Sequence, residues 1–116
     1  MLTIAKLLLG AGVLTGSLHH GWADYDTERA FTLVGTIQEV EYVNPHVLAR
    51  VRPVDDSTKI WLVVLAPPSR MTRRGLPQDS VRAGQVARLY GYPHRQLAEE
   101  MRAERITLGD RTTELR

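Results

Sequence analysis

Apolar and polar residues alternate along several short stretches of this chain, and such alternation is typical of half-buried strands. The first stretch covers residues 31–46, and its apolar residues include Leu33, Ile37, Val40 and Val43. Gly35 weakens any helix there, so the pattern predicts one long bent strand. Pro45 has no backbone N–H and disfavours a helical residue before it, so the strand ends in a corner formed by Asn44, Pro45 and His46.

Two shorter stretches follow this corner. Residues 47–52 alternate between apolar and polar, and residues 59–65 form an almost continuous apolar run. Asp55, Asp56 and Ser57 lie between the two stretches and are typical turn residues. The two strands are therefore predicted to pair as a hairpin.

A short helix and a fourth strand are predicted next. Pro68 suits the first turn of a helix and Gly75 suits its end, which predicts a helix over residues 68–74. Residues 86–92 alternate again and predict a strand. The helix therefore lies between the third and fourth strands of the chain.

The last part of the chain predicts a loop and a second hairpin. Residues 96–101 are polar and predict a loop, while residues 103–108 and 112–115 predict a hairpin that turns at Gly109 and Asp110. A helix between the third and fourth strands suits an OB-like barrel of about five or six strands, which removes exposed sheet edges. A β-sandwich is the alternative fold.

The N-terminal segment has the features of a secretory signal peptide. Lys6 precedes an apolar run that is shorter than the roughly twenty residues of a spanning helix. We expect residues 1–18 to be removed, with the cleavage point open between residues 17 and 23. The mature chain, residues 19–116, is then one domain with an N-terminal arm, residues 19–30. It is predicted to be periplasmic or secreted in a bacterium, without a stable membrane span.

Composition narrows the chemistry that is available. The chain has 116 residues, enough for one domain, and its 15 Lys and Arg residues against 13 Asp and Glu residues give a net charge of only +2. Nucleic-acid binding is not expected from so small a charge. The absence of cysteine excludes disulfides and thiolate chemistry. No phosphate-binding glycine loop, nucleophile elbow or zinc-protease motif is present, so we predict that the protein is not an enzyme.

The four histidines are the candidate metal ligands. His19 and His20 lie in the arm, while His46 and His94 each follow a proline at the end of a predicted strand. Imidazole suits copper, nickel and zinc, so a cluster of these side chains predicts a transition-metal site. Cleavage after Ser17 would also place a histidine third from a free amine, a nitrogen-rich arrangement that favours Cu(II) or Ni(II).

Other residues are candidates on the same rim of the barrel. These are Asp24 and Asp26, which add oxygen ligands, and Asn44 and Trp61. The alternative function is docking of a protein partner or small ligand at the rim without a metal. A less favoured alternative is oligonucleotide binding, in which Trp61 would stack on a base.

The chain also resembles a known family. The resemblance is carried by the signal peptide and by His19, His20, Asp26, Gly35, Asn44, Pro45, His46, Trp61, Arg74, Gly75, Gly84 and Gly91. This pattern resembles a family of small exported bacterial proteins classed only as a domain of unknown function. The resemblance implies export and a small barrel-like β fold, and it implies no established activity.

Overall fold

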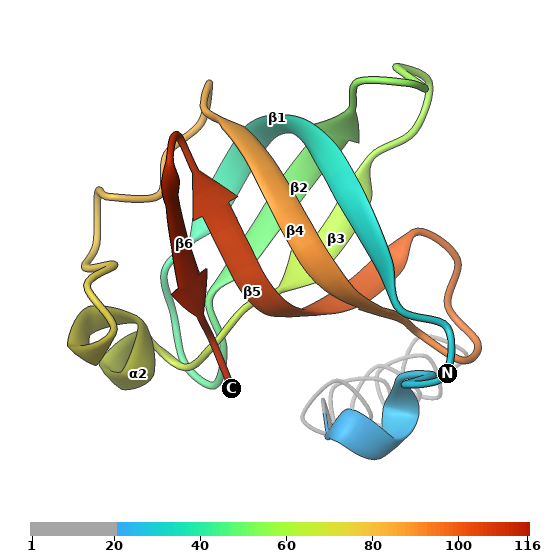
Figure 1. Ribbon diagram of the computed structural model, residues 1–116, viewed down its shortest axis with the longest axis horizontal. Coiled ribbons are helices and arrows are strands. Elements are labelled where there is room, and N and C mark those ends of the chain that lie inside the picture. Colours follow the sequence, from blue (N-terminus) through green and yellow to red (C-terminus); the bar gives the residue numbers. More distant parts are fainter. Residues whose placement is uncertain (1–20) are drawn as a thin grey trace, which may run out of the picture.

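Six strands and two short helices make up residues 21–116, the part of the chain that this computed structural model describes (Figure 1). The strands are β1 (Phe31–Glu41), β2 (Leu48–Pro53), β3 (Trp61–Val64), β4 (Val86–Pro93), β5 (Glu100–Leu108) and β6 (Arg111–Glu114). The helices are the 3-10 turn η1 (Trp22–Asp24) and the α-helix α2 (Pro68–Arg73). Within the described residues, no helix is long and apolar enough to cross a membrane.

The strands close into a barrel rather than stacking as a sandwich. Their order is β3-β2-β1-β4-β5-β6, and β3 also pairs in parallel with the first half of β5. Strands β1 to β5 therefore form a closed, mixed barrel, and β6 adds to the second half of β5. The predicted OB-like barrel, with its helix between β3 and β4, is confirmed, as is the hairpin of β2 and β3.

Strand β1 bends around the barrel and pairs with β2 and β4 along different parts of its length. Gly35 lies where both pairings meet, and a Cβ there would overlap the backbone carbonyl of Arg52. This close approach explains why glycine stands at the bend. The predicted strand extended too far, because β1 ends at Glu41. Tyr42 leaves the ladder and its hydroxyl donates to the Leu76 carbonyl at 2.8 Å.

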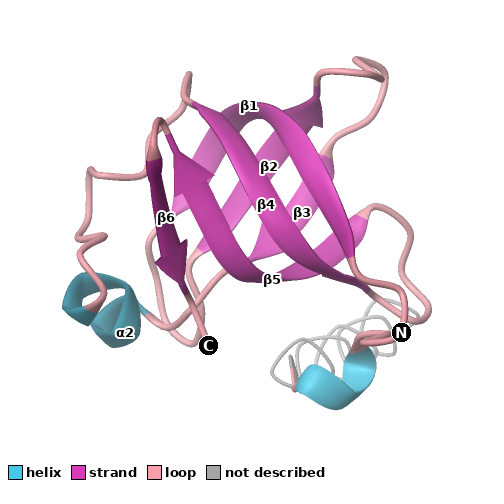
Figure 2. Cartoon of the chain, in the orientation of Figure 1, coloured by secondary structure: helices cyan, strands magenta, loops and turns pink. Residues whose placement is uncertain are grey.

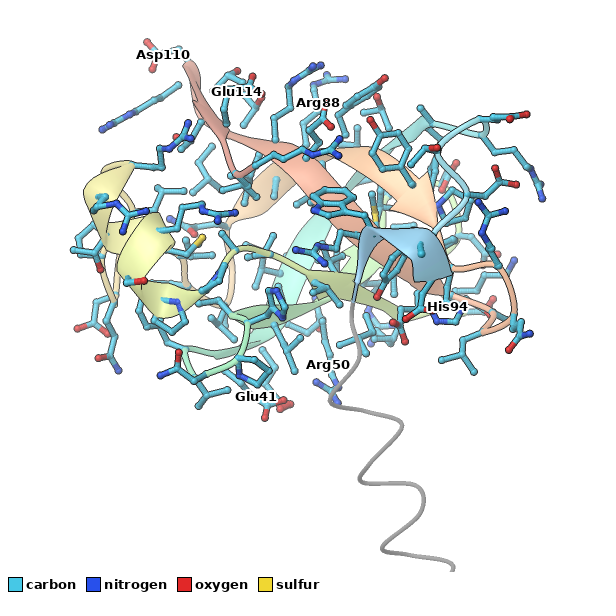
Figure 3. The ribbon with its side chains drawn as sticks, turned by 90° about the horizontal axis from the view of Figure 1, so that it is seen from below. Glu41, Arg50, Arg88, His94, Asp110 and Glu114 are labelled. Atoms are coloured by element: carbon cyan, nitrogen blue, oxygen red, sulfur yellow. The ribbon has the colours of Figure 1, made fainter. Side chains whose placement is uncertain are left out.

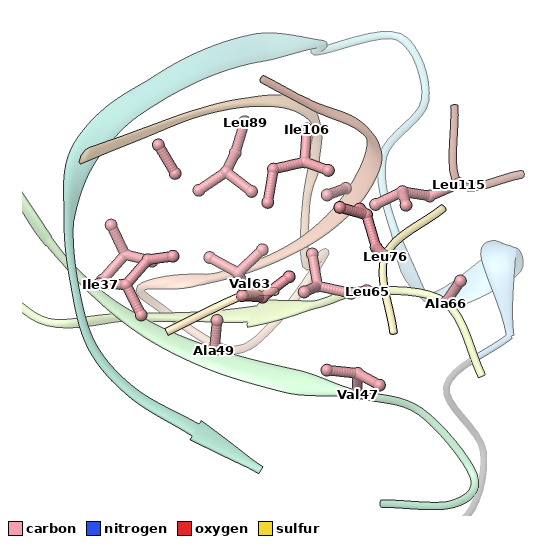
Figure 4. Close-up of a cluster of buried hydrophobic side chains, with 14 of the residues drawn as sticks. Ile37, Val47, Ala49, Val63, Leu65, Ala66, Leu76, Leu89, Ile106 and Leu115 are labelled. Atoms are coloured by element: carbon pink, nitrogen blue, oxygen red, sulfur yellow. The ribbon is translucent and has the colours of Figure 1, made fainter. Parts of the chain in front are cut away.

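The loops gather at two ends of the barrel, which we name after the segment that packs near each of them (Figure 2). At the helix end, where β1 and β3 finish, α2 packs with Met71 completely buried. At the arm end, where β1 and β3 begin, the N-terminal arm packs against the end of β4 and the start of β5. A continuous core runs between the two ends and includes Ile37, Val63, Leu89 and Ile106 (Figure 4).

One predicted loop is wrong at its C-terminal side. Residues 96–101 were expected to form a loop, but β5 begins at Glu100 and Met101 is fully buried in the core. The cause is the parallel pairing of Val63 with Met101, which extends β5 toward the arm end. A local pattern of polar residues does not reveal a partner strand that lies elsewhere in the chain.

Candidate functional site

The arm returns to the barrel from Gly21 onward. Tyr25 makes an antiparallel bridge with His94, and the Asp26 N–H donates to the Pro93 carbonyl at 2.9 Å. The Asp24 carbonyl accepts from the Arg95 N–H at 2.9 Å. The described part of the arm is therefore attached by backbone hydrogen bonds to the end of β4 and the loop after it.

His94 stabilises the loop between β4 and β5. Its Nδ1 accepts hydrogen bonds from the backbone N–H groups of Gln96 and Leu97, at 3.1 and 3.0 Å. Its ring packs edge-on against Tyr25, with 5.0 Å between the centroids, and lies beside η1 (Figure 3). A neutral imidazole that accepts at Nδ1 carries its proton on Nε2. Metal binding at Nε2 would therefore move that proton to Nδ1, where two N–H donors already point.

A buried polar network joins the arm to β5. The Tyr25 hydroxyl donates to Glu100 Oε2 at 2.7 Å, and these residues are 0% and 6% exposed. Arg102, also 6% exposed, places its guanidinium 4.2 Å from the centre of the Trp22 ring. Its Nη2 lies 3.2 Å from His46 Nε2. We call these five residues the arm junction.

The arm junction changes the proton affinities of its members. Burial, and then the hydrogen bond to Glu100, raises the pKa of Tyr25 well above its usual value. Burial lowers the pKa of Arg102. Shifted groups of this kind occur at functional sites and also in structural ion networks. Here the contacts of Tyr25 and Trp22 hold the arm to β5, and the contact of Arg102 with His46 ties β5 to the loop before β2, so the first role of the network is attachment.

The structure does not bring the predicted metal ligands together. Among residues 21–116, no three His, Asp or Glu side chains are grouped so that they could hold a metal ion. Arginine only donates, so His46 Nε2 accepts from Arg102 and faces a cation rather than an open site. His19 and His20 lie outside the described residues. The metal site stays a prediction that rests on those two arm residues.

The other predicted rim residues are dispersed. Asp26 Oδ1 accepts from the Glu28 N–H at 3.1 Å and lies 4.0 Å from Arg95 Nη1, so it orders the arm. Asn44 is exposed in the loop between β1 and β2, before the cis bond to Pro45. Asp24 contributes its backbone groups to the arm. These positions do not form one site in the described part of the chain.

Trp61 belongs to a different feature, a groove at the arm end. Its ring is half-buried and packs against Phe31, with 5.2 Å between the centroids. The two rings come from the first residues of β3 and β1, and they line a groove of about 430 Å³. We call this the β1 groove. It is lined by Phe31, Thr32, Leu33, Pro53, Asp55, Asp56, Lys59 and Trp61.

The β1 groove exists because β1 is longer than its partner. β4 pairs with residues 31–36 of β1, whereas pairing with β2 begins only at Gly35 opposite Pro53. The loop after β2 then turns away from β1. Strand β4 consequently lies along one side of the first residues of β1 (Figure 1), and the other residues that line the groove lie on the opposite side.

Comparison with protein-family models decides the family. The model of a family of unknown function, DUF6152, matches residues 8–101. The chain belongs to the DUF6152 family. This confirms the resemblance inferred from the sequence, and the family brings no activity with it. A search of curated proteins finds no match to this DUF6152 chain.

Solved structures with a similar fold come from TiaS, a tRNA agmatidine synthetase. A complex of TiaS with its tRNA and ATP aligns with a TM-score of 0.53 and 18% identity over 79% of this chain and 20% of that one. Apo TiaS aligns with a TM-score of 0.51 and 18% identity over 72% of this chain and 18% of that one. The DUF6152 chain thus spans about a fifth of those structures. At this identity the likeness shows the barrel fold alone.

Sequence reasoning missed the main residues of the arm junction. Glu100 lies in the stretch 96–101 that was predicted to be a loop, and Arg102 follows that stretch, yet both side chains are buried. The arm sequence around Tyr25 has no helix or strand periodicity, so no contact was predicted for Tyr25. The available signal was the density of aromatic residues in the arm, since Trp22 and Tyr25 need something to pack against.

Proposed function

We propose that this DUF6152 chain is an exported, non-enzymatic binding protein that docks its partner in the β1 groove. The observation that carries the proposal is the groove itself. Its volume of about 430 Å³ lies within the range of about 300–1,000 Å³ that is usual for ligand sites. Its lining combines two aromatic rings with charged side chains, the usual combination for recognition.

The position of the groove also favours binding. It lies at the mouth of a β-barrel, a common place for ligand sites. The other end of the barrel is covered by α2, and the buried polar groups of the arm junction are engaged in holding the arm. The β1 groove brings two half-buried aromatic rings next to charged side chains at the arm end.

Site-specific photo-crosslinking in the producing bacterium tests this function. We would place p-benzoylphenylalanine at Thr32, an exposed residue that lines the groove, and at Asp110, an exposed turn residue outside it, as the matched control. The full chain with its own leader would be expressed, irradiated and recovered from the periplasmic fraction.

The expected result is an adduct of defined mass from position 32 and none from position 110. The adduct should disappear when Trp61→Ala is added, provided that circular dichroism shows the barrel intact. Equal labelling from both positions, or no adduct from position 32, would overturn the proposal. Recovery only from the cytoplasmic fraction would contradict export.

Transition-metal binding is the second candidate function, and it depends on the arm. Trp22 lies over Arg102, whose guanidinium contacts His46, so the residues that directly follow His20 reach this corner of the barrel. A free amine with a histidine in third position would bind Cu(II) without using His46 or His94. Titrating the exported mature protein with Cu(II) should then give a 1:1 absorbance change that is lost in His20→Ala and retained in His94→Ala. The absence of any absorbance change would rule it out.

A further inference from the structure

The first half of β1 presents backbone hydrogen-bonding groups to the β1 groove. Ile37 directs both its N–H and its C=O toward the residues before β4, with bonds to Gln85 and Gly84 of 2.8 and 2.7 Å. Hydrogen-bonding groups point to alternating sides along a strand. Val34, three residues earlier, accordingly accepts from Val54 on the opposite side at 3.0 Å.

The same alternation shows to which side of β1 the backbone groups of Thr32 point. Its N–H and C=O point to the side of Val34, where β2 has already ended and the groove begins. Within residues 21–116, no backbone bond outside the sheet ladders involves Thr32, and its side chain is exposed. The backbone N–H and C=O of Thr32 can therefore pair with an added strand that lies where β2 would continue if it were longer.

We propose that the β1 groove accepts an extended peptide segment of a partner protein, which adds to β1 as a short strand. The peptide backbone pairs with Thr32, and one apolar or aromatic side chain lies against Phe31 and Trp61. Strand addition of this kind obtains affinity from main-chain hydrogen bonds and specificity from a pocket for alternate side chains. This inference rests on the proposed function, because it names the partner for the same groove.

The charges of the groove indicate which peptide fits. Two carboxylates, Asp55 and Asp56, and one ammonium group, Lys59, line it, so its walls carry a net negative charge. Asp56 is already engaged by Thr58 and lies 3.8 Å from Lys59. Asp55 makes no ion pair within residues 21–116. A basic side chain next to the apolar one is therefore favoured.

A second copy of the chain is a poorer occupant than a basic peptide. Pairing two β1 edges about a twofold axis would bring the same two carboxylates of each copy to the same interface. Like charges brought together in this way oppose association. A partner segment with the opposite charge avoids that repulsion.

The test separates the contribution of backbone hydrogen bonds to peptide binding from the contribution of side-chain contacts. The probe is a blocked hexapeptide in which Phe and Val alternate with Lys and Thr, compared with the same peptide N-methylated on its pairing amides and with a version carrying Glu for Lys. Affinity for the mature chain and its variants would be measured by NMR of the Trp61 indole N–H, which every variant retains. Chemical shift and hydrogen exchange of the residue-32 amide would be followed in the chains that have it.

Thr32→Pro and Thr32→Val form the matched pair of variants. Proline removes the N–H that faces the groove, and a strand edge tolerates it because that N–H does not pair with β4. Valine retains the N–H. We expect the unmodified peptide to slow exchange of the Thr32 amide, Thr32→Pro and N-methylation each to weaken binding about tenfold, and Thr32→Val to change it less than about twofold. The Glu peptide should bind more weakly than the Lys peptide.

Several outcomes would overturn strand addition. Peptide binding that is unchanged by Thr32→Pro and N-methylation would show docking through side chains only. No perturbation of the Thr32 amide by any peptide would reject a peptide strand, even if crosslinking at position 32 succeeds and the groove therefore binds something else. A dimer in sedimentation that Thr32→Pro abolishes would identify a second copy as the occupant.

Discussion

Two short helical segments pack against the barrel and are held in opposite ways. Neither η1 at the arm end nor α2 at the helix end has a side-chain N-cap, and neither is long enough to persist alone. α2 is held by an apolar side chain, Met71, which is fully buried. The arm is held by a hydrogen bond from Tyr25 to a buried carboxylate and by a guanidinium over Trp22.

This difference shows what apolar burial and a buried polar network each contribute to stability. An apolar side chain contributes stability that is proportional to buried area and nearly independent of pH. A buried polar network fixes one geometry, but it stabilises the fold only while each member keeps the protonation state that its partners require. The helix end should therefore be sensitive to volume, and the arm end to proton concentration.

The largest effect is expected at the helix end. Met71→Ala should lower the free energy of unfolding by about 3 kcal/mol, because it removes buried methylene groups and leaves a cavity in the core. Urea denaturation would measure the loss. The control is Arg73→Ala on the exposed side of α2, which should change the value by less than about 0.5 kcal/mol. Equal losses in the two variants would contradict an apolar attachment.

A smaller effect is expected at the arm end. Tyr25→Phe should cost about 1–3 kcal/mol at neutral pH, because Glu100 loses the hydroxyl donor at 2.7 Å while remaining buried. Tyr92→Phe makes the same chemical change at a hydroxyl that donates to Glu104 at 3.0 Å, in a less buried place, and should cost less. If Tyr92→Phe proved the more damaging change, the arm junction would not be the main polar attachment.

Alkaline pH should separate the two ends. Burial and the hydrogen bond to Glu100 raise the pKa of Tyr25. The folded chain therefore holds this proton more tightly than the unfolded chain, in which the pKa of tyrosine is about 10. The stabilisation is complete below that pH and decreases as the pH rises above it, by up to about 1.4 kcal/mol per pH unit. Between about pH 10 and 11.5 the wild type and Met71→Ala should lose stability in parallel, and Tyr25→Phe should lose less. Three parallel curves would refute the linkage.

The smallest effect is expected from the partly exposed ion pair between Asp26 of the arm and Arg95 of the loop after β4. Asp26→Asn retains an oxygen for the Glu28 N–H and removes the charge that faces Arg95 at 4.0 Å. Exposed pairs of this kind contribute roughly 0–1 kcal/mol and are screened by salt. We expect a loss below about 0.5 kcal/mol that vanishes in about 1 M salt, measured by denaturation at both ionic strengths. A loss above about 1 kcal/mol that persists in salt would show that surface charge also holds the arm.

The sequence alone determined the barrel, the position of its helix and the family. Alternation predicted the strands, and prolines and glycines marked where elements end, because these signals depend on period and on local backbone geometry. The structure contains the predicted strands even where their boundaries differ from the predicted ones, as at Glu41, where β1 ends, and at Glu100, where β5 begins. They also placed Trp61 in the third strand.

Only the tertiary structure decided what the special side chains do. Glu100 is buried because Tyr25, 75 residues away, covers it, and no local pattern contains that contact. The hydrogen bonds that His46 and His94 accept, which determine the nitrogen that carries each proton, likewise depend on groups brought together by folding. The β1 groove arises where β2 ends before β1 does, so it is a property of register between strands. Local patterns specify period and turns, whereas burial, tautomer and register depend on which distant segments meet.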